Sequence, residues 1–338
     1  MSLSHGNISI FVPHIGCPHQ CSFCNQVHIT GQSQKPDGEA VRKAVETAKA
    51  SRNYNPEVTE IAFFGGSFTA IDREYRLELL LEAYKYVKNG DVSGIRISTR
   101  PDAIDDGVLL ELKNHGVTAV ELGAQSMNDE VLEANHRGHT SQDVKIASRL
   151  IKDYGFSLGL QMMTGLFEDT EERSIETAKE IAALQPDTVR IYPTIVLDGT
   201  YLGDLYKAGK YTPQSVEEAV ACCVKITPIF EENHIKIIRL GLHSIDQSAF
   251  LAGPWHPAFG ELVECEKYRQ IALNKLTKFP KGNYVLYVNQ KEISKMTGQH
   301  RGNLEFLRKE GYDCKVKPNQ ELSKYQILIE PFNKNQGE

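Results

Sequence analysis

The stretch Gly16-Cys17-Pro18-His19-Gln20-Cys21-Ser22-Phe23-Cys24-Asn25 follows the apolar run Ile8-Ser9-Ile10-Phe11-Val12. Its three cysteines have the spacing C-x3-C-x2-C and lie in a short loop after a predicted strand. Thiolate is the soft ligand that iron–sulfur centres take, so three thiolates at this spacing can hold one cluster. No fourth cysteine is near in sequence, and three ligands leave one iron of a four-iron cluster open. The loop therefore predicts an iron–sulfur site with a vacant position for a substrate or cofactor.

Zinc is the alternative for the same loop. A structural zinc ion needs a fourth ligand, and His14, His19 or His28 could supply it. A disulfide is the weaker interpretation, because the chain has seven cysteines, an odd number, and no signal peptide. The loop alone leaves both metal sites open and favours the cluster.

Composition is that of a globular enzyme, with 41% hydrophobic and 24% charged residues in 338. This length allows one large α/β domain with a smaller appendage. No run of about 18 apolar residues occurs, so we expect no membrane-spanning helix and no membrane partner. The first five residues lack a targeting pattern, and we therefore expect a cytoplasmic protein.

The formal net charge of -6 is unevenly distributed. Residues 1–260 carry 24 Lys and Arg against 34 Asp and Glu, whereas residues 261–338 carry 14 against 10. A basic C-terminal part can be a nucleic-acid surface, but a net charge of +4 is far from the strongly basic footprint of a general nucleic-acid binder. A solvated surface is the favoured interpretation of this region.

Runs rich in β-forming residues alternate with amphipathic helical patterns from residue 7 to residue 193. Six such units predict a parallel sheet with crossover helices, and six are fewer than the eight of a closed barrel. We therefore expect an open, partial (βα)6 barrel. Asp169 with Glu172 predicts the start of a helix. Residues 198–234 are predicted to be helical, with a cap at Thr212-Pro213, and a further strand is predicted over 235–240.

Polar residues and glycines recur where these predicted strands end, which is the face on which parallel βα folds build their sites. Gly65-Gly66-Ser67 can be a plain turn, or two glycines that let backbone groups approach a ligand closely. Besides the cysteine loop, the residues predicted at successive strand ends are Gly66, Ser98, Gln125, Gln161 and Tyr192.

The remainder of the chain predicts a small α+β appendage, which places a core at 1–245, an extension at 246–332 and a disordered tail at 333–338. The segment 253–261 contains the one tryptophan and is either a rigid connector or a lid. We favour the connector and keep Trp255 and His256 as substrate candidates. The other cysteines, Cys222, Cys223, Cys265 and Cys314, are expected to be buried structural residues.

Over roughly residues 7–245 the chain resembles radical S-adenosylmethionine (SAM) proteins of the elongator-protein-3 class. The resemblance implies that Cys17, Cys21 and Cys24 bind a 4Fe–4S cluster whose open iron is chelated by the amino and carboxylate groups of SAM. It rests on Cys17-x3-Cys21-x2-Cys24, Gly65-Gly66-Ser67-Phe68, Arg100-Pro101-Asp102, Gly123-Ala124-Gln125-Ser126, Asn135-His136-Arg137-Gly138-His139-Thr140, and Ile191-Tyr192-Pro193-Thr194 with Gly199-Thr200.

The same resemblance implies roles for single residues. Gln125 and Gln161 match ribose contacts, and Arg137 matches a carboxylate ligand, although a surface ion pair is the alternative for that arginine. The other residues that the resemblance places around SAM, or around the substrate entrance beside it, are Phe23, Gly65, Gly66, Ser67, Ser98 and Tyr192.

The implied reaction is reductive cleavage of SAM to methionine and a 5'-deoxyadenosyl radical, which abstracts hydrogen from a substrate. The implied partners are SAM, an electron donor such as a flavodoxin or ferredoxin, and a tRNA or other RNA substrate. Elongator-type enzymes also carry an acetyltransferase domain and a basic N-terminal extension, for which this sequence leaves too few residues, so we expect a short bacterial relative. The alternative is a zinc-bearing or cluster-bearing binding module without SAM turnover.

Overall fold

The computed structural model describes residues 6–12, 21–24, 35–242 and 247–332. The chain divides into two compact units, Met1–Ser215 with Ile226–Trp255, and Val216–Lys225 with His256–Glu338. Within the described ranges no helix is both long and apolar enough to cross a membrane. The predicted tail at 333–338 lies outside the described residues, and the predicted boundary at residue 245 stays a prediction.

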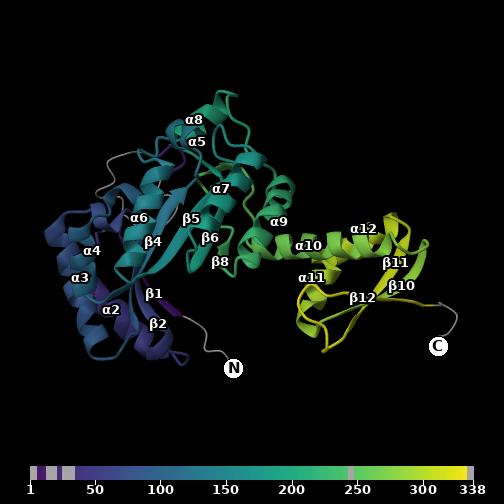
Figure 1. Cartoon of the computed structure of the whole chain (residues 1–338), viewed down its shortest axis with the longest axis horizontal. Helices are drawn as coiled ribbons and strands as arrows, with labels where there is room; N and C mark the ends of the chain where they lie inside the picture. Colours follow the sequence, from purple (N-terminus) through teal and green to yellow (C-terminus); the bar gives the residue numbers. More distant parts are fainter. Residues whose placement is uncertain (1–5, 13–20, 25–34, 243–246, 333–338) are drawn as a thin grey trace. The chain divides into compact units, whose positions relative to one another are not determined.

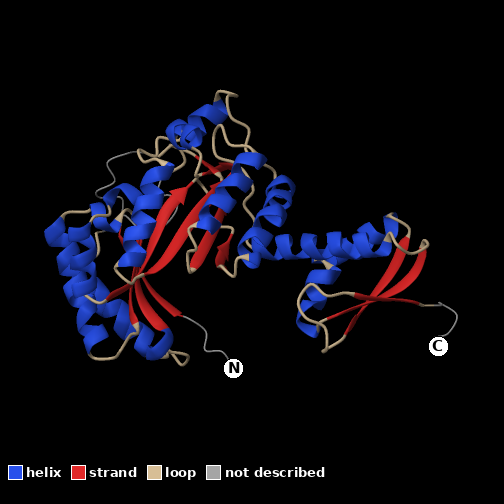
Figure 2. Ribbon diagram, viewed as in Figure 1, coloured by secondary structure: helices blue, strands red, loops and turns tan. Residues whose placement is uncertain are grey.

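The larger unit contains a seven-stranded sheet with strand order β1-β2-β3-β4-β5-β6-β8, in which every neighbouring pair is parallel. The sheet is curled into a half-barrel (Figure 2). This confirms the predicted open α/β barrel, with β8 as a seventh strand beyond the six predicted units. The strands are β1 Gly6–Val12, β2 Thr59–Gly65, β3 Gly94–Thr99, β4 Val117–Gln125, β5 Ser157–Thr164, β6 Thr188–Pro193 and β8 Lys236–Leu240.

Helices connect these strands, and α2 to α4, α6 and α7 lie along the outer side of the sheet (Figures 1 and 2). Their apolar periodicity explains the packing, as in α2, where Val41 and Val45 are completely buried and Asp37 caps the helix by accepting from the Ala40 N–H. The helices are α2 Gly38–Lys49, α3 Arg73–Lys88, α4 Asp106–Asn114, α5 Asp129–Ala134, α6 Ser141–Asp153, α7 Glu171–Ala183, α8 Tyr201–Lys207 and α9 Val216–Glu232.

Two helix boundaries differ from the predicted ones. Thr170, not Asp169, caps α7, because the Asp169 carboxylate is already used by the Gly165 N–H and the Ser174 hydroxyl. The predicted helical stretch 198–234 is two helices, α8 and α9, separated by 208–215. The left-handed backbone of Gly209, with φ +68°, ends the first of them.

The smaller unit is the predicted α+β appendage. Its three-stranded sheet has the order β11-β10-β12, with β10 Gly282–Val288, β11 Tyr312–Pro318 and β12 Leu328–Pro331. Helices α10 Phe259–Leu276, α11 Ile293–Thr297 and α12 Gly302–Lys309 contribute to one apolar core with this sheet. All four cysteines predicted to be structural are buried, at 0% to 6% exposure.

The inner surface of the half-barrel carries a belt of charged side chains, which we call the inner belt: Glu60, Arg96, Glu121, Arg190 and Arg239. Glu121 on β4 is only 1% exposed and holds the centre of this belt. Its carboxylate accepts two hydrogen bonds from Arg190 on β6, with Nε–Oε2 2.7 Å and Nη2–Oε1 2.9 Å. This bidentate geometry gives the strongest kind of side-chain ion pair.

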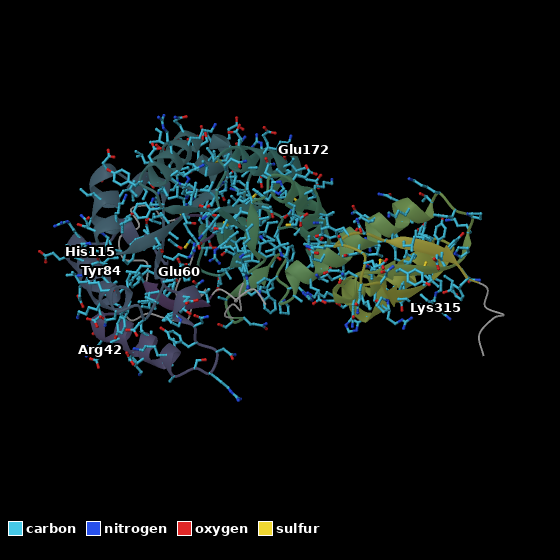
Figure 3. All side chains as sticks on the ribbon, turned by 60° about the horizontal axis from the view of Figure 1, so that its bottom comes forward. Arg42, Glu60, Tyr84, His115, Glu172 and Lys315 are labelled. Carbon is cyan, nitrogen blue, oxygen red and sulfur yellow. The ribbon has the colours of Figure 1, made fainter. Side chains whose placement is uncertain are left out.

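The inner belt continues on both sides of Glu121. Arg96 on β3 reaches Glu121 at 3.4 Å and Glu60 on β2 at 2.8 Å. The Arg190 guanidinium also lies 5.4 Å from the ring centroid of Phe64, which is on β2, so the first and the later strands face each other across the inner surface. In Figure 3 Glu60 lies toward the middle of the larger unit, whereas Tyr84 and His115 lie at its periphery.

Replacement of Glu121 tests the structural weight of the inner belt. Glu121→Ala leaves the Arg190 guanidinium buried without its carboxylate, so we expect a loss of about 3–5 kcal/mol in the free energy of unfolding. The matched control is Asp153→Ala, which breaks the exposed Arg149–Asp153 pair on α6 and costs at most about 1 kcal/mol. Urea unfolding followed by circular dichroism measures both.

The double variant Glu121→Leu/Arg190→Met separates loss of an ion pair from loss of packing. Because both charges are removed together, it is expected to recover most of the stability that Glu121→Ala loses. Equal losses in the free energy of unfolding for Glu121→Ala and Asp153→Ala would show that the buried pair stabilises the protein no more than an exposed one.

Candidate functional site

The cysteine turn is described over residues 21–24, where the Cys24 N–H donates to the Cys21 carbonyl at 3.1 Å. Cys21 is buried at 5% exposure, and Cys24 is partly exposed. Cys17 lies outside the described residues, as do the three histidines of the zinc alternative. Among the residues that are described, no three His, Cys, Asp or Glu side chains are grouped to hold a metal ion.

Asn135, which follows α5, holds the cysteine turn in place. The Ser22 N–H donates to the Asn135 carbonyl at 3.1 Å, and the Ser22 hydroxyl donates to Asn135 Oδ1 at 2.6 Å. The Asn135 amide in turn donates to the carbonyls of Val131 and Phe167. A fully buried asparagine with these partners fixes the turn relative to the loop after β5.

Arg137 joins the cysteine turn to the sheet. Its Nη1 donates to Cys21 Sγ at 2.9 Å, and its Nη2 donates to the Gly123 carbonyl of β4 at 2.6 Å. The residue is only 7% exposed, and its buried Nε has no hydrogen-bond partner among the residues that the structure describes. The alternative of a surface ion pair is therefore wrong. The guanidinium also lies 6.0 Å from the ring centroid of Phe23.

Gly65, the last residue of β2, is required by close packing. Gly65 has φ +113°, and a Cβ there would lie 2.3 Å from Cε2 of Phe11 on β1. The Gly66 N–H donates to the Val12 carbonyl at 2.8 Å. The Ser67 hydroxyl is shared with Thr99 at 2.8 Å. Because the Gly66 N–H and the Ser67 hydroxyl already have protein partners, the turn would contact a ligand through its other backbone groups.

Among the described residues, several buried polar atoms at this end of the barrel lack hydrogen-bond partners, including Ser98 Oγ, Gln125 Oε1 and Arg137 Nε. Ser98 is the penultimate residue of β3, and Gln125 ends β4 with a left-handed φ of +67°, which is strained for a residue other than glycine. Buried polar atoms are normally hydrogen-bonded, so these donors and acceptors fit a polar ligand. Beside a cysteine sulfur, they fit a cluster with a SAM molecule on it.

Gln161 and Tyr192 complete the residues predicted from the strand ends. Tyr192 is the penultimate residue of β6, and burial raises the pKa of its hydroxyl. Gln161 is instead three residues inside β5, so its predicted position at the strand end is wrong. Its Nε2 donates to Glu121 Oε2 at 2.9 Å, so its side-chain oxygen is the end of the amide that can accept a hydrogen bond from a donor group.

His139 received no role from the sequence, although it lies in the quoted motif 135–140. The ring is 5% exposed, its Nε2 lies 3.2 Å from the Ala124 carbonyl, and its Nδ1 has no partner. Burial, reinforced by the nearby Arg137 charge, lowers the pKa of His139 to about 4. The ring is therefore neutral at pH 7, and with Nε2 donating, Nδ1 is a buried acceptor.

Trp255 and His256 belong to different compact units. Trp255 packs against Phe250, with ring centroids 6.4 Å apart, and His256 Nδ1 accepts from the Ala258 N–H just before α10. Their role as substrate contacts stays a prediction.

A cavity of about 340 Å³ lies beside this site, between the loop 165–171 and the segment 210–214. Tyr211 lines it and donates to the Gly165 carbonyl at 2.5 Å, which closes one side. None of the predicted site residues lines this cavity, and the sequence analysis did not anticipate it.

The radical SAM superfamily domain matches residues 11–181, about half of the chain, and the Radical_SAM C-terminal domain matches residues 186–270. The tRNA uridine(34) acetyltransferase of Dehalococcoides mccartyi (strain CBDB1) is 27% identical over 240 residues, which cover 61% of this chain and 52% of that protein. Elongator complex protein 3 of Homo sapiens is 32% identical over 198 residues, which cover 52% of this chain and 36% of that protein.

Among solved structures, the archaeal Methanocaldococcus infernus Elp3 with an N-terminal deletion superposes with a TM-score of 0.63 and 25% identity. The superposition covers 80% of this chain and 64% of that chain. The chain therefore spans about half or less of the length of the two curated relatives. The superfamily domain covers the cysteine turn, Arg137 and the strands from β2 to β5. The chain belongs to the radical SAM superfamily, whose members are enzymes that use a 4Fe–4S cluster and SAM.

Proposed function

We propose that this chain holds a 4Fe–4S cluster through Cys17, Cys21 and Cys24, cleaves SAM reductively at that cluster, and acts in the modification of tRNA or another RNA. The observation that carries the proposal is the Arg137 guanidinium, which contacts Cys21 Sγ at 2.9 Å and has a buried Nε that no described residue pairs with. One side chain thus joins a cluster sulfur to an unfilled hydrogen-bonding position.

Arg137 is suited to the carboxylate of SAM. A guanidinium presents its donors in a planar fork that matches a carboxylate, and two of its nitrogens already hold it between Cys21 and Gly123. The orientation is therefore fixed before any ligand binds. A carboxylate bound at this guanidinium lies close to the cluster sulfurs, as chelation of the open iron requires.

The remaining site residues would orient the nucleoside part and exclude water. Gln161, Gln125 and Ser98 offer hydrogen-bonding atoms to ribose and adenine, and Phe23 packs against a small apolar cluster. When bound, the cluster and SAM supply one-electron cleavage of a carbon–sulfur bond, which is cofactor chemistry rather than protein chemistry. The apolar cluster beside the cysteine turn consists of Val196, Leu202, Leu205 and Tyr211.

The RNA substrate is proposed from the similar proteins, two of which are named for tRNA uridine(34) or for the Elongator complex. Because the chain matches only part of each, their acetyl transfer is not carried over. A flavodoxin or ferredoxin is the proposed source of the electron, and the cytoplasm is the proposed location.

Anaerobic reconstitution tests the cluster and the cofactor together. We expect the wild-type chain to bind about four irons and, after reduction with dithionite, to release 5'-deoxyadenosine from SAM. Cys24→Ser is expected to lose both the iron and the product, because it removes a proposed ligand. Iron analysis and chromatography of the nucleoside measure the two results.

Cys314→Ala is the matched control, since this buried cysteine lies in the smaller unit and is expected to leave iron content and product unchanged. A chain that binds one zinc ion and no iron would contradict the proposal. So would a reduced cluster that never yields 5'-deoxyadenosine, which would favour a binding module without turnover.

Binding of tRNA tests the substrate class. We expect binding at about 50 mM salt, with log Kobs falling linearly with log salt concentration, because phosphate contacts release counterions. Filter binding over a salt series measures the slope, and a mononucleotide at equal phosphate concentration is the control. Absence of tRNA binding at low salt would count against an RNA substrate.

A further inference from the structure

The inner belt contains one more cation than its carboxylates neutralise. Arg96 lies between Glu60 and Glu121, and Arg190 is held by Glu121. Within the described residues no carboxylate pairs with Arg239, the fifth member of the belt. The belt thus has three guanidinium groups and two carboxylates, and the surplus positive charge is at β8.

Arg239 lies on the same inner surface as the rest of the belt. It is the pairing partner of Arg190 in the parallel ladder between β6 and β8, so the two side chains leave the sheet on one face. Its Nε donates to the Gly241 carbonyl at 2.9 Å and its Nη2 to the Leu242 carbonyl at 2.6 Å. The side chain is thereby held in one orientation, and no hydrogen bond from Nη1 is recorded to any described residue.

Tyr192 is the neighbouring polar group on this surface, two residues along β6 from Arg190. Tyr192 and Arg190 are the charged or titratable groups that interact with Arg239 in the described part of the chain. Partial burial and the positive Arg190 lower the pKa of Arg239, yet a guanidinium stays charged at neutral pH. A partly buried cation that faces another cation is costly unless an anion joins it.

We propose that Arg239, with the Tyr192 hydroxyl beside it, is an anion subsite that binds a phosphate of the polynucleotide substrate on the inner surface of the half-barrel. A guanidinium already held on two donors keeps an N–H edge for phosphate oxygens, and a phenol adds one donor. The subsite lies on the same inner surface as Gln161, which is the pairing partner of Arg190 between β5 and β6. This inference rests on the proposed function, because it assumes that the substrate is an RNA.

The test uses the full chain without its cofactors and tRNA as the probe. We expect Arg239→Gln to bind tRNA several-fold more weakly and to lower the slope of log Kobs against log salt by about 0.9, the contribution of one phosphate contact. Arg239→Lys keeps the charge and is expected to retain the slope. Tyr192→Phe is expected to weaken binding with no change in slope, because it removes a neutral donor.

Arg149→Gln is the matched control, since this arginine lies on α6 with 84% of its side chain exposed. We expect its slope to equal that of the wild-type chain. Circular dichroism establishes whether each variant is folded. If Arg239→Gln is unfolded, Tyr192→Phe decides the question, and an unchanged tRNA affinity for Tyr192→Phe would contradict the subsite.

The outcomes separate this inference from the proposed function. If wild-type protein binds no tRNA at low salt, the RNA substrate fails, and the subsite fails with it. If the wild-type chain binds tRNA with a steep salt slope and Arg239→Gln has the same slope and affinity, the subsite is wrong while the proposed function stands.

Discussion

The carboxylate of Glu121 is the constraint on which the inner surface depends. It is buried on the middle strand of the sheet and is shared by side chains from β3, β5 and β6, namely Arg96, Gln161 and Arg190. A charge in this position is tolerated only when its partners keep exact positions, because a misplaced partner leaves a desolvated charge unpaired. The four strands are therefore fixed in register by one side chain, as well as by their backbone ladders.

Strand β4 also connects Glu121 to the proposed cofactor site. Glu121 and Gly123 alternate along β4 and so lie on one face of the sheet. A register shift follows Gly123, and the Gln125 amide lies against Gly123. The Gly123 carbonyl holds Arg137, and Arg137 reaches the sulfur of Cys21. A Cβ at residue 123 would lie 2.8 Å from the Gln125 amide nitrogen, so a larger residue there would displace the Gln125 side chain. The position of the cysteine turn thus depends on a chain of contacts that starts at the inner belt.

The sequence predicted the βα alternation because apolar runs report burial directly, and it located Ser98, Gln125 and Tyr192 where strands end. It misplaced Gln161, because sequence does not reveal how far a strand continues through paired backbone. The inner belt escaped prediction for a related reason: each member is one charged residue inside an apolar run, and its partners come from distant segments. The signal was present in the repeated pattern of Glu60, Arg96, Glu121, Arg190 and Arg239, each flanked by β-forming residues.

The incomplete barrel explains why the surplus charge is where it is. Arg96 on β3 and Arg190 on β6 each have a carboxylate partner on another strand of the sheet, Glu60 on β2 and Glu121 on β4. In contrast, β8 is the last strand of the sheet and has β6 as its one neighbour. In a closed barrel a further strand could supply the missing carboxylate to Arg239. In the half-barrel no further strand of the described residues pairs with β8, so an anionic ligand is the partner that we propose for Arg239. The position of the surplus charge thus follows from the end of the sheet at β8, and it suits the negative charge of the proposed RNA substrate.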